Sequence, residues 1–67
     1  MKLSARNILK GKVRQITKGK TTAAVKIAVG ASMVTASITM EALDELKLKK
    51  GETAYAIIKA SDVIVGK

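Results

Sequence analysis

Apolar and polar positions alternate most regularly between residues 21 and 29. A period of two places successive side chains on opposite faces of a β-strand, so this run predicts a strand with one apolar face. The residues on that face are Thr21, Ala23, Val25, Ile27 and Val29. Residues 30–32 are short enough for a hairpin loop, and the alternation resumes at 33–38, which predicts the returning strand.

A looser alternation covers residues 3–16. Leu9 and Val13 fall on one side of this run and basic residues fall on the other, as in a half-buried strand. Gly11 lies in its middle, and a glycine within a strand often marks a bulge or a sharp bend of the kind that small barrels use. We therefore expect a long first strand with a bulge or bend at Gly11, followed by a turn at 17–20.

The hydrophobic period changes from two to about 3.6 at Thr39. Met40, Leu43 and Leu46 have the spacing of one helical face, and the hydroxyl of Thr39 is placed to cap the first turn. Acidic residues come first in this segment and lysines follow, an order that the helix dipole favours. Gly51 is expected to end the helix.

Strand patterns return after the helix, at 53–59 and, beyond a turn at 60–62, at 63–65. The complete order is three strands, a helix and two strands. This order fits a mainly β fold, a five-stranded barrel of the oligonucleotide/oligosaccharide-binding (OB) type with one short helix between strands 3 and 4. We expect residues 1–67 to form a single domain.

Charge and composition narrow the possible functions. Thirteen Lys and Arg residues stand against five Asp and Glu, a net charge of +8, so the partners are expected to be anions. Without Cys or His the usual metal ligands and acid–base pairs are missing, and there is no phosphate-binding glycine loop, so we do not expect an enzyme.

No apolar run approaches the roughly 18 residues of a membrane helix, and no signal peptide is visible, so a cytoplasmic location is expected. A chain this small has a marginal core, which favours self-association.

Two short segments rich in hydrogen-bond donors stand far apart in the sequence. The first is Ser4-Ala5-Arg6-Asn7, at the head of the first predicted strand, and the second is Lys59-Ala60-Ser61-Asp62, after the last strongly apolar strand. The carboxylate of Asp62 does not suit an anion site, and we expect it to point away. Each combines a cation with a hydroxyl, and backbone amides beside small side chains can add donors. Taken singly, Arg6 and Lys59 are more typical of solvated strand ends; together the segments suggest two halves of an anion site. Asn7 is as well suited to bonding the backbone at the strand entry as to contacting a ligand.

These two segments, with the run Leu9-Lys10-Gly11-Lys12-Val13 and residues 35–39, resemble the molbindin (Mop) family. Members of that family are small cytoplasmic proteins of the TOBE class that bind molybdate and tungstate. The resemblance implies an OB-type barrel, molybdate or tungstate as the bound ligand, and a hexamer built as a trimer of dimers. It also implies that the oxyanions are held at subunit interfaces.

The resemblance assigns roles to particular residues. Ser4, Ala5 and Arg6 match the first ligand segment of the family. Lys59 and Ala60 match the second, with Ser61 beside them. The family also implies two hydroxyls from a neighbouring copy. One corresponds to Thr39, while the other is missing here because Ala42 occupies its position.

Molybdate is a tetrahedral dianion whose four oxygens accept hydrogen bonds and which stays deprotonated at neutral pH. A matching site offers hydrogen-bond donors and positive charge. The candidate cations are Arg6, whose guanidinium can donate two hydrogen bonds to one anion, and Lys59, whose ammonium is a compact positive charge. The candidate hydroxyl donors are Ser4, Thr39 and Ser61. A site made only of donors also penalises a protonated phosphate oxygen, whose hydrogen finds no acceptor. Tungstate has nearly the same size and charge, so we expect no strong preference between the two.

The alternative from another class is a small basic OB-type nucleic-acid-binding module. Lys10, Lys12 and Arg14 form a basic stripe along the first predicted strand. OB-type barrels that hold single strands stack bases on aromatic side chains, however, and this chain has only Tyr55. Nucleic-acid binding is therefore a weaker hypothesis than oxyanion binding. A third hypothesis is an assembly or regulatory domain with no ligand of its own.

Overall fold

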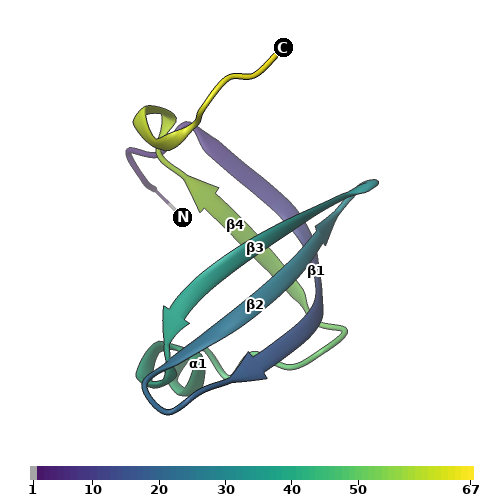
Figure 1. The fold of residues 1–67 in the computed structure, drawn as a ribbon, viewed down its shortest axis with the longest axis vertical. Helices are drawn as coiled ribbons and strands as arrows, with labels where there is room; N and C mark the ends of the chain where they lie inside the picture. Colours follow the sequence, from purple (N-terminus) through teal and green to yellow (C-terminus); the bar gives the residue numbers. More distant parts are fainter. Residues whose placement is uncertain (1) are drawn as a thin grey trace.

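The computed structural model describes residues 2–67 as one antiparallel sheet with a short helix and a 3₁₀ turn (Figure 1). The strand order in the sheet is β3-β2-β1-β4. The strands are β1 (Asn7–Lys18), β2 (Thr22–Val29), β3 (Ser32–Thr39) and β4 (Thr53–Ile58). The helix α1 (Met40–Leu46) follows β3, and the 3₁₀ turn η1 (Ala60–Asp62) follows β4.

The sheet curls around a small aliphatic core. Val25 and Ile27 of β2 point inward, as the alternation at 21–29 predicts, and burying such a side chain stabilises the fold by about 1.5–3 kcal/mol. Leu43 closes the core from α1. The buried residues are Val13, Ala23, Val25, Ile27, Leu43, Ala54 and Ala56.

Strand β1 joins the two halves of the sheet. Its first part pairs with β4, from Asn7 opposite Ile58 to Lys12 opposite Thr53. Its second part pairs with β2, starting at Lys12 opposite Ala28. β1 ends at Lys18, so the strand continues through part of the predicted 17–20 turn.

Gly11 allows β1 to pass closely over β2. A Cβ added at Gly11 would collide with the carbonyl oxygen of Ala28 and would lie 2.8 Å from Cγ2 of Ile27. The bulge itself lies elsewhere, between Val13 and Gln15, where the register with β2 shifts. Of the two features predicted at Gly11, a bulge or a bend, the bulge was wrong: this glycine allows a close backbone approach where the two ladders of β1 meet, whereas a bulge needs only one extra residue in the strand.

Helix α1 begins after Thr39, whose Oγ1 accepts the N–H of Ala42 at 3.0 Å, so the predicted cap is confirmed. The helix ends at Lys47, which adopts the left-handed conformation (φ 52°) and donates its N–H to the carbonyl of Asp44 at 3.2 Å. The predicted stop at Gly51 was therefore wrong, because a lysine supplies the left-handed cap earlier. No helix in residues 2–67 is long and apolar enough to cross a membrane.

The fifth strand predicted at 63–65 is not formed within the described chain. These residues extend from η1 away from the sheet in Figure 1 and have no strand partner. The described residues thus form an open half-barrel of four strands, not a closed barrel of five, and β3 and β4 are its free edges. Leu46, which the helical spacing placed on the core face, is 63% exposed beside this opening.

Candidate anion-binding site

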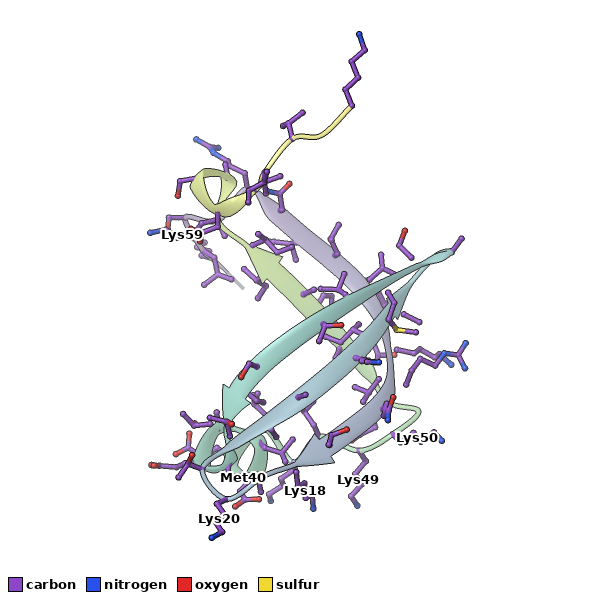
Figure 2. All side chains as sticks on the ribbon, viewed as in Figure 1. Lys18, Lys20, Met40, Lys49, Lys50 and Lys59 are labelled. Carbon is purple, nitrogen blue, oxygen red and sulfur yellow. The ribbon has the colours of Figure 1, made fainter. Side chains whose placement is uncertain are left out.

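Pairing of β1 with β4 brings the two donor-rich segments to the same end of the sheet. Asn7 lies opposite Ile58 at the end of this ladder. Residues 4–6, including the half-buried Ala5, are irregular backbone that leads into β1 at the point where residues 59–61 leave β4. Figure 2 shows Lys59 at this end, near the N-terminal segment.

The side chain of Asn7 connects the two segments. Its Nδ2 donates a hydrogen bond of 3.2 Å to the carbonyl oxygen of Ile58, and the bond is partly buried. Of the two roles considered for Asn7, the structure shows the bond to the backbone. Because Ile58 directly precedes Lys59, this bond adds to the ladder at the point where the second segment leaves the sheet. Sequence reasoning missed Ile58, since its carbonyl is used and no side-chain signal marks it.

The second segment folds into η1. Two hydrogen bonds close the turn: the N–H of Asp62 donates to the carbonyl of Lys59 at 2.9 Å, and the N–H of Val63 donates to that of Ala60 at 3.2 Å. The first N–H groups of a helical turn have no partner inside it. The turn therefore leaves the amides of Ala60 and Ser61 available to an outside acceptor.

The candidate donor side chains at this end, called the donor cluster below, are exposed. Arg6 and Lys59 supply the charge, and the hydroxyls of Ser4 and Ser61 are exposed beside them in the sequence. Asp62, in the same turn, is an exposed carboxylate. Water and salt weaken the attraction between exposed charges. A tight anion site at this end therefore needs a second surface that excludes water.

Thr39 lies at the opposite end of the molecule. It pairs with Thr22 where the β2–β3 ladder meets α1, whereas Asn7 and Ile58 mark the far end of the β1–β4 ladder. Figure 1 shows α1 and η1 at opposite ends of the fold, whose long axis measures 34 Å. One chain therefore does not bring Thr39 to the other predicted site residues. Its oxygen accepts the N–H of Ala42, but its own hydroxyl proton can still be donated.

The donor set determines which ligand this cluster suits. Guanidinium, ammonium, hydroxyl and amide groups all donate hydrogen bonds, so they match an anion whose oxygens only accept. A directly coordinated metal cation is a poor match, because residues 2–67 contain no cluster of three or more His, Cys, Asp or Glu side chains.

The half-barrel and its donor-rich end match what a small β protein that binds oxyanions requires. The chain belongs to the TOBE domain family, whose model matches residues 3–65. It is 51% identical over 67 residues to the probable molybdenum-pterin-binding protein of Haemophilus influenzae, and the match covers 98% of this chain and 97% of that one. It is 41% identical over 66 residues to molybdenum-pterin-binding protein 3 of Clostridium pasteurianum, covering 97% of each.

Solved structures show the same fold. A molybdate-binding protein from Sporomusa ovata superposes with a TM-score of 0.95 at 33% identity over the whole of both chains. The cytoplasmic molybdate-binding protein ModG, with molybdate bound, gives a TM-score of 0.90 at 48% identity, and the match covers 96% of this chain but 46% of ModG. These findings confirm the resemblance to the molbindin (Mop) family and the mainly β architecture.

Proposed function

We propose that this protein binds molybdate, and tungstate equally well, and holds the oxyanion without altering it. Relatives of nearly the same length are molybdenum-pterin-binding proteins, and neighbours in fold are molybdate-binding proteins. The binding unit is the single TOBE-type domain of residues 1–67. Its role is to buffer or store the oxyanion in the cytoplasm, the compartment given for ModG.

The register of β1 against β4 supports this proposal most directly. Because Asn7 lies opposite Ile58, the segment with Ser4 and Arg6 and the segment with Lys59 meet at one end of the sheet. Charge-assisted hydrogen bonds of this kind are roughly twice as strong as neutral ones. A doubly charged tetrahedral oxyanion can accept from several of these donors at once.

The relatives' names mention molybdenum-pterin as well as molybdate, and the donor cluster favours the bare oxyanion. A pterin ring would need an aromatic or apolar surface to stack on. The chain's one aromatic residue, Tyr55, lies opposite Lys10, three ladder positions from Asn7 and therefore about 10 Å along the strand. The cluster itself offers charges and donors only.

The position of Thr39 favours a site shared between copies. If Thr39 contributes a hydroxyl, it must come from a second chain, because it lies at the other end of its own chain from Arg6 and Lys59. The same contact would cover the exposed cluster and exclude water from it. We propose the hexamer, a trimer of dimers, as the assembly that does this, with Ala42 leaving one hydrogen bond of the site unmade.

Isothermal titration calorimetry with molybdate, tungstate and sulfate tests this function. Molybdate and tungstate are expected to give similar affinities and sulfate little heat. Arg6→Ala should weaken molybdate binding roughly 10- to 150-fold, since hydrogen bonds to charged groups are worth about 1.5–3 kcal/mol. Arg14→Ala is the matched control, because Arg14 is also an exposed arginine but lies in the middle of β1.

Two results would contradict the proposal: equal heat for sulfate, or an Arg6→Ala variant that binds molybdate as the unmodified protein does. Filter binding of single-stranded and duplex DNA at two salt concentrations tests the nucleic-acid alternative. That alternative predicts affinity that falls steeply with salt and depends on Arg14 at least as much as on Arg6.

A further inference from the structure

The outer face of the sheet carries a row of positive charge along β1. Lys10 and Lys12 are exposed at successive outward positions, which lie about 7 Å apart on a strand, and Arg14 follows them, exposed in the bulge. Lys26 of β2 is exposed on the same face, because it lies two residues before Ala28, which pairs with Lys12. We call Lys10, Lys12, Arg14 and Lys26 the basic sheet face.

No carboxylate of the strands neutralises this face. The four strands, residues 7–18, 22–29, 32–39 and 53–58, contain no Asp or Glu. All five acidic side chains lie outside them, at residues 41–52 and 62. Glu52, which directly precedes β4, lines a pocket beside α1 together with the buried Leu43. The positive charge of the basic sheet face is therefore not compensated within the sheet.

The cations are surrounded by short or uncharged side chains. Thr53 lies opposite Lys12 on β4, while Gln15 and Thr35 lie opposite Lys26 on either side. All three uncharged side chains are exposed and can donate hydrogen bonds. The face is the outside of a curled sheet and is therefore convex, whereas sites for small molecules are concave. A macromolecule suits this surface better than a small ion does.

We propose that the basic sheet face is a docking surface for a second protein that presents a row of carboxylates. Acidic side chains two residues apart on a strand, or four apart on a helix, are spaced by about 6–7 Å. That spacing matches the outward positions of Lys10 and Lys12 on β1. Complementary charge of this kind raises the rate of association and fixes the orientation of the partner.

A nucleic acid fits this face less well than an acidic protein does. The row of cations lies on β1, which has β2 on one side and β4 on the other, and the major groove of a duplex admits at most a two-stranded ribbon. Single strands need aromatic side chains on which bases stack, and the chain's one aromatic residue, Tyr55, lies on the edge strand β4.

The basic sheet face is separate from the donor cluster. Lys10 and Lys12 lie three and five ladder positions from Asn7, about 10 and 17 Å along β1. A protein docked on the face can therefore leave residues 4–6 and 59–61 open to an anion. The inference does not rest on oxyanion binding, and its test needs no molybdate.

Fluorescence anisotropy at physiological salt tests the docking surface with a short labelled peptide that carries glutamate at every second position. The peptide should bind, and the double variant Lys12→Gln/Arg14→Gln should bind it roughly 2- to 30-fold more weakly, the range for loss of two exposed ion pairs. Lys20→Gln/Lys49→Gln is the matched control, because it removes the same charge from exposed lysines that Figure 2 shows at the α1 end. Its affinity for the peptide should stay within 2-fold of that of the unmodified protein.

Three results of this experiment would overturn the proposal. One is a peptide that does not bind, and another is equal weakening by both pairs of substitutions, which would show an effect of net charge alone. The third is a duplex DNA that binds more tightly than the peptide and depends on the same two residues, which would make the partner a nucleic acid.

An NMR titration of the unmodified protein locates the contact without any variant. The acidic peptide should shift the backbone amides of residues 10–15 and 26–28 before those of other segments. Shifts confined to residues 4–6 and 59–61 would place the peptide on the donor cluster and overturn the proposal.

Discussion

Asn7 shows how one side chain can organise a site that it need not contact. Its side-chain amide donates a hydrogen bond to the carbonyl of Ile58, at the end of the β1–β4 ladder from which both donor segments extend. The candidate anion-binding residues are exposed, so their positions depend on the backbone that carries them. Strand pairing, more than side-chain packing, therefore orders this end of the molecule.

Asn7→Ala is expected to lower the free energy of unfolding by about 0.5–1.5 kcal/mol, the net contribution of a typical hydrogen bond. It should also weaken molybdate binding several-fold, because residues 4–6 and 59–61 are then held less firmly together. Urea unfolding and calorimetry measure the two effects. Gln15→Ala is the control, since Gln15 is an exposed amide on the same strand and its loss should change stability by less than about 0.5 kcal/mol. Unchanged stability and affinity in Asn7→Ala would show that the bond is dispensable.

At the scale of secondary-structure elements, β1 connects the two halves of the sheet, because it pairs with β4 along its first part and with β2 along its second part. The two ladders overlap at Lys12, directly after Gly11. The close approach to Ala28 at Gly11 is therefore the point where the sheet turns from one half to the other. The orientation of the site end relative to the α1 end depends on this crossing.

Gly11→Ala should destabilise the protein by about 1–3 kcal/mol or more, because the new methyl group meets the backbone of Ala28, which cannot move aside as a side chain could. Urea unfolding followed by circular dichroism measures the loss. Gly66→Ala is the matched control, since a Cβ there meets nothing within 4 Å, and it should change stability by less than about 0.5 kcal/mol. Equal stability of the two variants would mean that β1 can shift without disturbing the sheet.

What the sequence predicts about these elements depends on whether the signal is local. The strand at 22–29, the hairpin after it and the Thr39 cap follow from alternation and from a hydroxyl at the right position, and all three are confirmed. The end of α1 was missed because Lys47 takes a left-handed conformation for which its residue type gives no signal. The segment 63–65 has strand composition, but whether it pairs depends on a partner that the local pattern does not specify.

The candidate site likewise has features that local sequence predicts and features that depend on how distant segments pair. The two donor segments could be predicted from their composition and the family resemblance, but their meeting depends on the β1–β4 register, which the sequence does not specify. Thr39 is well predicted as a cap, yet only the topology shows that it lies at the far end from Arg6. Sequence therefore indicated which groups suit an oxyanion better than it indicated which of them meet within one chain.

At the scale of the whole molecule, small size and high charge act together. A chain of 67 residues buries only about 60% of its unfolded surface, and its buried core contains three alanines among seven residues. A net charge of +8 adds self-repulsion, which grows when copies assemble. A bound dianion at the positive end reduces this repulsion, so ligand and assembly should stabilise each other.

This coupling gives the last prediction, a rise in the unfolding midpoint Tm with molybdate. A ligand that binds only the folded state stabilises it by about 2.7 kcal/mol at 100 times its Kd. For a domain of this size that corresponds to a Tm increase of roughly 10–20 °C, measurable by calorimetry or circular dichroism. Sulfate at the same concentration controls for ionic strength and should raise Tm far less, and Arg6→Ala should lose most of the molybdate effect while Arg14→Ala keeps it. If sulfate and molybdate raised Tm equally in all three proteins, the stabilisation would come from general screening of the positive charge and not from a site at residues 4–6 and 59–61.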